Sequence, residues 1–107
     1  MSDEFNKYDL GDLVLVRGTF TDFDSEDPLD PTTVKLSVRD PSGNVETYIY
    51  ESLGTGNTLD KESTGVYSKE IDCDEAGDWF YRWFSTGNGQ AAKERHFEVL
   101  PARAVEV

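Results

Sequence analysis

The clearest strand signal in the chain lies at residues 78–85, which read DWFYRWFS. Trp79, Tyr81 and Trp83 occupy every second position of this segment, and a β-strand points alternate side chains to the same side of its sheet. Large aromatic rings on one side of a strand most often belong to a core. The segment therefore predicts a strand that packs three aromatic side chains into a protein interior.

The same alternation continues on both sides of this segment, between clusters of Gly, Pro, Asn and Asp. No stretch keeps the helical spacing of apolar residues. Residues 52–64 are mostly polar, and we expect either a long surface loop or an irregular edge strand there. Short strands at this spacing predict an all-β fold, a two-sheet antiparallel β-sandwich of about seven strands. The clearest expected strands are 12–20, 33–39, 45–51, 65–71, 78–85 and 93–100.

Two short segments predict hairpin turns. Residues 40–44 read DPSGN, in which Pro presets a turn and Gly accepts a positive φ. Asn88 and Gly89 both tolerate the left-handed backbone of a type I′ turn. With these turns in place, one parity of each strand is expected to be buried. The predicted core is Val14, Val16, Phe20, Val34, Leu36, Val38, Tyr67, Ile71, Trp79, Tyr81, Trp83, Phe97 and Val99.

Composition limits the classes of function. The 107 residues leave room for one small core, and 22 acidic against 10 basic residues give a formal net charge of −12. Binding to nucleic acid or to anionic membranes depends on the opposite charge, so neither is an expected partner. The chain has no long apolar run, and its first eight residues lack the basic and apolar regions of a signal peptide. We expect a soluble protein that is made in the cytoplasm.

The single Cys and the single His offer little for catalysis. Cys73 lies between Asp72 and Asp74, whose charges disfavour a thiolate, so we expect a passive thiol. His96 has the opposite parity to Phe97 and is expected to face solvent, without the second His that a metal site would need. No Gly-rich phosphate loop is present either. An enzyme is therefore not expected.

The segment 74–81, DEAGDWFY, resembles the corner that leads into strand F of immunoglobulin-like (Ig-like) domains. A wider series of motifs is similar to the small Ig-like proteins encoded among the virion structural genes of tailed phages and related viruses. The resemblance implies an Ig-like sandwich over residues 9–100, an N-terminal arm at 1–8 and a C-terminal tail at 101–107. The motifs are 9–12 (DLGD), 30–34 (DPTTV), 39–44 (RDPSGN), 63–67 (STGVY), 76–83 (AGDWFYRW) and 97–99 (FEV).

The resemblance implies a non-enzymatic structural component of a tailed-virus particle, located in the virion after synthesis in the host cytoplasm. Within that class, we expect a capsid decoration or accessory protein that docks through one sheet face and its termini. The alternative is an Ig-like module on the virion head or tail that binds host-surface glycans. The partners expected for a docking protein are capsid or tail subunits, with a second copy of the chain as a further option.

If the strands follow Ig order, four of them form one sheet whose outward side chains are aromatic and basic. Tyr, Phe and Arg are enriched at interface cores, so this face is the candidate docking surface. The alternative is that aromatic residues merely favour strands and that Arg stems cover them. The face is expected to carry Lys35, Arg39, Tyr48, Tyr50, Phe80, Arg82, Phe84 and His96, with Phe5, Tyr8, Val105 and Val107 as apolar contacts in the tails.

Two acidic segments are the only candidates for a metal site. Asp22, Asp24 and Glu26 alternate as the oxygen ligands of hard cations do, although the Gly and the terminal Glu of an EF-hand loop are missing. In an Ig-like sandwich, we expect this loop to emerge at the same end as Asp72 and Asp74, so that the two clusters could converge on Ca²⁺. The alternative is a solvated acidic loop. No other cofactor is expected.

Overall fold

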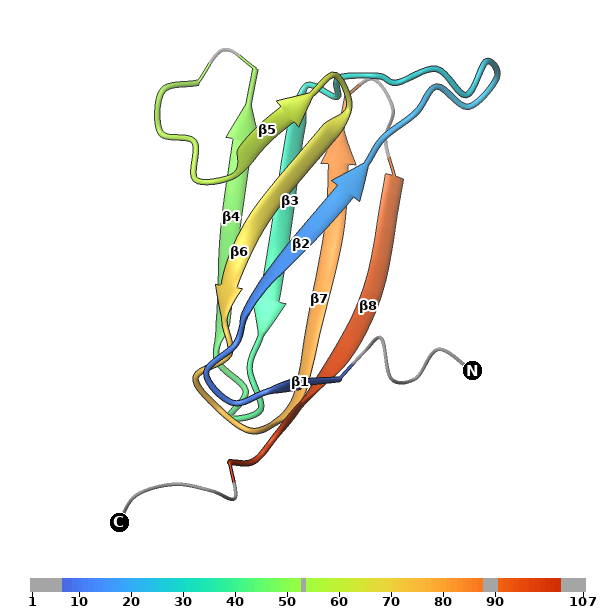
Figure 1. Ribbon diagram of the computed structural model, residues 1–107. Helices are drawn as coiled ribbons and strands as arrows, with labels where there is room; N and C mark the ends of the chain where they lie inside the picture. The colour runs from blue at the N-terminus through green and yellow to red at the C-terminus, as the bar shows by residue number, and fades with distance from the viewer. Residues whose placement is uncertain (1–6, 53, 88–90, 103–107) are drawn as a thin grey trace.

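The computed structural model describes residues 7–52, 54–87 and 91–102 of the 107-residue chain (Figure 1). This part of the chain contains eight strands and no helix, so none of it is a helix that could span a membrane. The predicted all-β class is confirmed. The strands are β1 (Lys7–Asp9), β2 (Leu13–Thr19), β3 (Thr33–Arg39), β4 (Val45–Glu51), β5 (Asp60–Ser63), β6 (Val66–Asp72), β7 (Gly77–Thr86) and β8 (Ala91–Leu100).

The strands form two sheets that lie face to face. The large sheet has the order β1-β8-β7-β3-β4, and the small sheet, in front of it in Figure 1, has the order β2-β6-β5. Apart from the parallel pairing of β1 with β8, every paired neighbour is antiparallel. If β2 to β8 are taken as strands B to G with one extra strand beside C, this is the variable-type order of an Ig sandwich.

The core fills the space between the sheets. Every residue of the predicted core is buried except Tyr81, which is half-buried against it. Leu59 and Cys73 are also buried, although neither was predicted. Gly18 is essential to this packing, because a Cβ atom at that position would lie 2.7 Å from the Trp83 ring. A glycine opposite a large indole lets the edge of the small sheet close onto the large sheet.

The β3–β4 hairpin has a register that differs from the predicted facing of β4. Asp40 N donates to Asn44 O and Gly43, at φ 95°, completes the tight turn, so Arg39 lies opposite Val45. Residues directly opposite each other share a face. Val45, Thr47 and Ile49 therefore point outward with Arg39. The prediction that Tyr48 and Tyr50 point outward is wrong, because both follow Val34 and Leu36 towards the core.

The N-terminal boundary also differs from the prediction. Lys7 and Tyr8 were assigned to an arm, but they lie in β1 and pair with Glu98 and Val99 of β8. The Tyr8 ring meets Phe97 edge to face at a centroid distance of 5.5 Å. This contact makes Tyr8 part of the sandwich rather than of a free tail.

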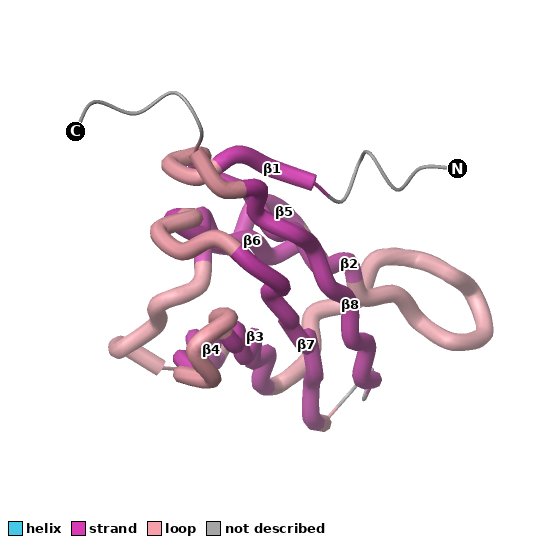
Figure 2. The backbone as a smooth tube through the Cα atoms, turned by 90° about the horizontal axis from the view of Figure 1, so that it is seen from below, coloured by secondary structure: helices cyan, strands magenta, loops and turns pink. Residues whose placement is uncertain are grey.

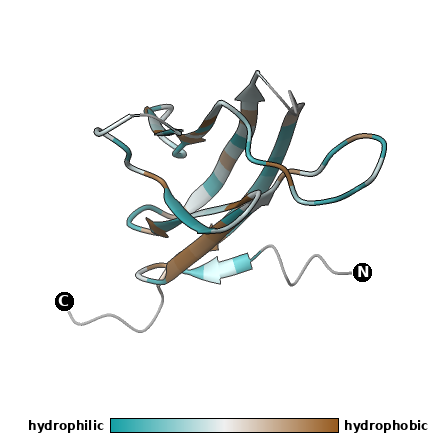
Figure 3. Ribbon diagram, turned by 90° about the horizontal axis from the view of Figure 1, so that it is seen from above, coloured by the Kyte–Doolittle hydropathy of each residue, from teal (hydrophilic) through white to brown (hydrophobic). Residues whose placement is uncertain are grey.

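Strand β2 and the loop that follows it differ in hydropathy. Figure 3 shows β2 as an apolar strand over most of its length, whereas the loop at 20–32 is largely polar. Strand β2 is apolar along most of its length because both of its faces carry apolar side chains: Leu13 and Leu15 lie on the outer face, and Val14 and Val16 are buried on the inner face. Seen from below in Figure 2, the 20–32 loop projects away from the body of the domain.

Candidate functional site

Three rows of side chains cross the outer face of the large sheet. One row aligns Phe84, Lys35 and Ile49, the next aligns Arg82, Ser37 and Thr47, and the third aligns Phe80, Arg39 and Val45. His96 extends the third row onto β8, where it lies opposite Phe80. We call the set Lys35, Arg39, Phe80, Arg82 and Phe84 the cation–aromatic face.

Two cations of this face, Lys35 and Arg82, are in contact with the Phe84 ring. Lys35 Nζ lies 5.8 Å from the centroid of the Phe84 ring, and Arg82 Cζ lies 5.2 Å from the same centroid. Phe80 and His96 are tilted against each other with a centroid distance of 5.9 Å. Cation–π contacts of this kind contribute about 0.5–1 kcal/mol at exposed sites. They hold the long cationic side chains against the sheet instead of leaving them extended into solvent.

The face remains open to solvent. Phe80 is 41% exposed and Val45 is 57% exposed. A shallow groove of about 380 Å³ lies beside them, lined by Ser37, Arg39, Val45, Phe80, Tyr81, Arg82 and Glu94. A side chain from another molecule can enter this groove and contact both an aromatic ring and a guanidinium group.

Within the described residues, none of the three cations of the face is neutralised by a close ion pair. In the part of the chain that the structure describes, the ion pairs are Arg17 with Glu62 and Lys61 with Asp30, both away from this face. Glu94 lies opposite Arg82 across β7 and β8, but no ion pair joins them. In a chain of net charge −12, the face therefore keeps available positive charge.

The structure places six of the eight predicted face residues together: Lys35, Arg39, Phe80, Arg82, Phe84 and His96. Tyr48 and Tyr50 lie instead on the inner face of β4, where they pack against the core. The Tyr50 ring lies 5.3 Å from that of Tyr67, and Lys69 Nζ lies 4.7 Å from the centroid of Tyr48. The residues that replace them on the outer face are Val45, Thr47 and Ile49, which the length of the DPSGN turn could have indicated.

Of the predicted tail contacts, only Tyr8 can be placed, and it packs on the core in β1. Phe5, Val105 and Val107 lie outside the described residues, as do Asn88 and Gly89 of the second predicted turn. The strands that flank this turn do pair, with Ser85 opposite Ala91.

The two acidic segments do not converge, so the prediction that they emerge at the same end of the sandwich is wrong. β2 pairs with β6 so that Leu13 lies opposite Asp72 and Thr19 lies opposite Val66. The loop with Asp22, Asp24 and Glu26 follows Thr19, whereas Asp74 follows Asp72 at the other end of the sandwich. Within the described residues, no three His, Cys, Asp or Glu side chains form a group that could hold a metal ion.

The Asp22 segment has a structural explanation instead. Asp22 Oδ2 accepts a hydrogen bond from Ser25 Oγ at 2.9 Å, and Asp22 N donates to Asp27 O. These bonds fold the loop tip back on itself. Phe23 at this tip is 95% exposed.

The thiol of Cys73 is buried. Burial, reinforced by the charges of Asp12, Asp72 and Asp74, raises the pKa of Cys73 to about 11. A thiol with this pKa is almost entirely protonated at neutral pH and is a weak nucleophile. Cys73 is a core residue, in line with the passive thiol expected from its acidic neighbours.

No family model, curated protein or solved structure matches the chain. The fold defines a class, the two-sheet β-sandwich with Ig strand order, and the candidate site is one open sheet face of it.

Proposed function

We propose that this protein is a non-enzymatic docking subunit that binds an acidic or mixed-charge protein surface through the cation–aromatic face. The observation that carries the proposal is that Lys35 and Arg82 lie against the Phe84 ring and Arg39 lies opposite the exposed Phe80, in a chain of net charge −12. Within the described residues, none of these three cations has a close ion pair. Arg and aromatic residues are the types that most often contribute binding energy at protein interfaces.

The setting that we propose is a tailed-virus particle, in which the protein is a capsid decoration or accessory subunit. The ordered motifs from residues 9–12 to 97–99 support this setting. A small sandwich with one cationic sheet face and acidic loops suits such a role, because the acidic remainder of the surface keeps the unassembled subunit soluble.

The competing account is that the face is ordinary solvated sheet surface. Aromatic residues favour strands, and Arg stems cover apolar area. Under that account, a charge reversal on the face changes neither folding nor assembly. Under the docking proposal, the same change places a like charge against the partner and breaks the complex.

The test is incorporation of a tagged Arg82→Glu/Phe84→Ser variant into purified particles from the cells in which they assemble. We expect incorporation to be lost while the isolated domain remains folded. The matched control is Arg17→Glu/Leu15→Ser, which makes the same two kinds of change on the outer face of the small sheet, and its incorporation is expected to be normal. Normal occupancy of the Arg82→Glu/Phe84→Ser variant on the particle would refute the docking face.

A second candidate function is glycan binding by the 20–32 loop. Phe23 is 95% exposed at the loop tip and is flanked by Asp22 and Asp24. Exposed aromatic rings beside carboxylates are suited to stack on sugar rings and accept hydrogen bonds from hydroxyl groups. Screening of the wild type and of Phe23→Ala against immobilised glycans separates the two functions. A glycan-binding protein should bind at least one glycan as the wild type and lose that binding in Phe23→Ala, whereas the docking function requires no glycan binding.

A further inference from the structure

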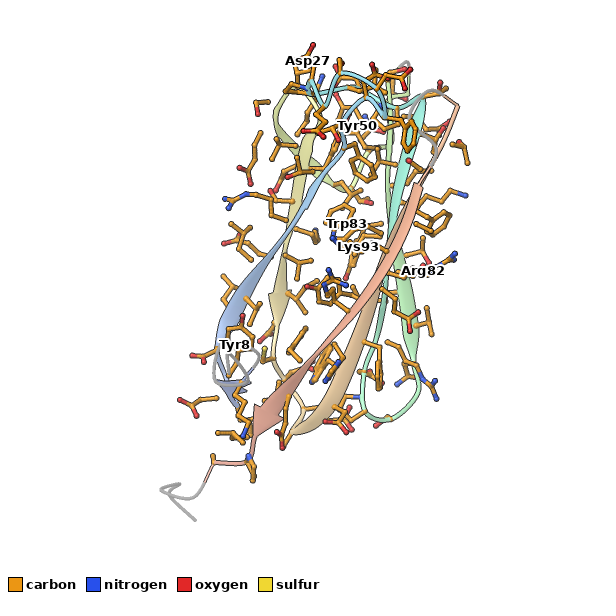
Figure 4. All side chains as sticks on the ribbon, turned by 90° about the vertical axis from the view of Figure 1, so that its right-hand side faces the viewer. Tyr8, Asp27, Tyr50, Arg82, Trp83 and Lys93 are labelled. Carbon is orange, nitrogen blue, oxygen red and sulfur yellow. The ribbon has the colours of Figure 1, made fainter. Side chains whose placement is uncertain are left out.

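The sandwich is open along the side where β2 of the small sheet faces β8 of the large sheet. A groove of about 430 Å³ lies there, larger than the one on the cation–aromatic face. Figure 4 looks into this side and shows Trp83 and Lys93 together between the ribbons of β2 and β8. Its lining includes Arg17 and Gly18 of β2, Tyr81 and Trp83 of β7, and Lys93 and Arg95 of β8.

Both strands that border the groove have an unpaired edge within the described part of the chain. β2 is the last strand of the small sheet and pairs only with β6. β8 pairs with β1 only from Glu98 to Leu100, so its edge from Ala91 to Phe97 has no neighbouring strand there. Unpaired backbone N–H and C=O groups of this kind are a template for an added strand.

Two cations on β8 occupy positions that belong to the core side of the sheet. Lys93 lies opposite Trp83 and Arg95 lies opposite Tyr81, and both partners point inward. Further along the same strand, Phe97 and Val99 fill the equivalent positions and are buried. Arg17 differs, because its guanidinium is held by Glu62 at 3.1 Å. Lys93 and Arg95 therefore supply the positive charge that is available to a ligand in the groove.

Trp83, one of the residues that line the groove, carries a hydrogen-bond donor without a partner in the described residues. Trp83 is 5% exposed, and its Nε1 atom is buried without a partner in the described residues. The other indole contrasts with it, since Trp79 Nε1 donates to Glu75 O at 2.9 Å. A buried donor without an acceptor is unfavourable, because it has lost its hydrogen bonds with water. An acceptor that enters the groove would offset part of that loss.

We propose that this groove receives an extended, acidic segment of a partner polypeptide. The segment adds a strand along the Ala91–Phe97 edge of β8 and continues the position that β1 occupies further along the same edge. Alternate side chains of the added strand point inward, with the same two-residue spacing that separates Lys93 from Arg95. Carboxylates at alternate positions of the segment pair with these two cations, and one of them accepts from Trp83 Nε1.

A competing explanation needs no ligand. Inward-pointing charges on an edge strand protect a sheet from pairing with other chains. On that account, an added strand of any charge is disfavoured, because it would bury the charges of Lys93 and Arg95. The proposal differs because it expects the edge to accept strands that carry carboxylates at the matching spacing.

The test uses the full-length ¹⁵N-labelled protein and synthetic peptides of about eight residues, the length needed to cover the open edge. One peptide alternates Glu with Thr, a second alternates Lys with Thr, and a third has the composition of the first with its Glu residues adjacent in pairs. The two indole Nε1–H resonances are followed during titration. We expect the first peptide to shift the Trp83 signal and leave the Trp79 signal in place, and the others to bind at least about tenfold more weakly.

Two variants make the test specific. Lys93→Glu/Arg95→Glu is expected to weaken binding of the alternating Glu peptide at least about tenfold. The milder Lys93→Gln/Arg95→Gln serves if the reversal disturbs folding, which the Trp79 signal reports. Arg39→Glu on the cation–aromatic face is the control and is expected to bind normally. No shift of Trp83 with the alternating Glu peptide, or equal shifts with all three peptides, would overturn the proposal.

The chain's own acidic N-terminal residues are the other occupant to test. If Asp3→Asn/Glu4→Gln moves the Trp83 resonance in the absence of peptide, those residues already fill the groove and the proposal of a partner segment is overturned. The result of the peptide experiment does not depend on whether the proposed function is correct. Peptide binding does not involve the cation–aromatic face, and the Arg82→Glu/Phe84→Ser variant leaves the Lys93 and Arg95 groove unchanged.

Discussion

The large sheet and the small sheet each turn one face to solvent, and both faces carry exposed apolar side chains. Leu13 and Leu15 of the small sheet are 62% and 48% exposed, values close to those of Val45 and Phe80 on the large sheet. The two faces differ in their charge. Glu70 lies opposite Leu15 and Asp72 opposite Leu13, while Arg17 is neutralised by Glu62.

This contrast shows why exposed apolar area alone does not mark an interface. Scattered apolar side chains are normal on a folded surface. The large sheet differs because Lys35 and Arg82 lie against the half-buried Phe84 ring, and neither has a close ion pair in the described chain. Four kinds of substitution test this difference between the faces, and the first is expected to destabilise the protein most.

Removing a side chain from the core between the two sheets should destabilise both sheets, and with them both outer faces. Trp79 stacks on Phe97 at a centroid distance of 5.8 Å and an interplanar angle of 10°. Trp79→Ala leaves a large cavity and should cost about 3–5 kcal/mol, measured by denaturant unfolding. Trp79→Phe should retain most of that stability. An unchanged unfolding midpoint for Trp79→Ala would contradict the position of Trp79 in the core.

Gly18→Ala should push the two sheets apart at the groove. The added Cβ atom would lie 2.7 Å from the Trp83 ring, so either the ring or β2 must move. We expect a loss of about 1–3 kcal/mol and a shifted Trp83 indole resonance. Gly56→Ala is the matched control, because its Cβ atom meets no atom within 4 Å. Equal stability of the two variants would contradict the close packing of β2 on Trp83.

Asp30 tests how the small sheet is tied to the polar 20–32 loop. Its carboxylate accepts from Gly65 N at 2.7 Å, from Lys61 Nζ at 2.9 Å and from Tyr67 Oη at 3.3 Å. The hydrogen bond from Lys61, followed by that from Gly65, lowers the pKa of Asp30 below its ordinary value of 3.8. A lowered pKa in the folded state means that the ionised carboxylate stabilises the fold.

The stabilisation by Asp30 is fully present above pH 3.8 and is lost as the pH falls through the lowered pKa. Asp30→Asn should therefore cost about 1 kcal/mol near neutral pH, kept small because the pair is partly exposed to solvent. The cost should shrink in strong acid. Thermal unfolding of both proteins between neutral and acidic pH measures this difference. A cost independent of pH would show that the charge of Asp30 plays no part.

Single charge reversals should have the smallest effect on folding and should sharpen the contrast between the faces. Arg39→Glu and Glu70→Lys both change exposed side chains, so neither should alter the unfolding midpoint appreciably. Their effects on docking should differ. Arg39→Glu should weaken particle binding and reduce its dependence on salt, whereas Glu70→Lys should leave both unchanged. Weaker binding of Arg39→Glu together with tighter binding of Glu70→Lys by the same factor would mean that overall charge matters and the face does not.

Much of the fold could be predicted because the alternation of side chains along a strand is a local property of the backbone. Val14, Val16, Trp79 and Trp83 all lie on the buried parity of their strands, as their spacing indicates. The facing of β4 was also available in principle. A five-residue segment from Asp40 to Asn44 places Arg39 opposite Val45, and counting across it turns Tyr48 inward.

Other features depended on contacts between distant parts of the chain. Leu59 is an isolated apolar residue in a polar stretch, and it is buried because it lies beside β4, where its N–H donates to Ile49 O. The acidic segments after Thr19 and after Asp72 lie at opposite ends because β2 and β6 are antiparallel neighbours. No local pattern contains that information.

The burial of side chains in most strands therefore follows from the order of amino acids, since period-two alternation requires only neighbouring residues. The neighbours of each strand, and the edges that stay open, depend on tertiary contacts. Lys93 and Arg95 illustrate the reason. They share the parity of the buried Phe97, yet they are exposed, because the order of strands leaves that part of β8 without a partner in the described chain. Burial depends on what packs against a position, and that is set by contacts across the whole chain.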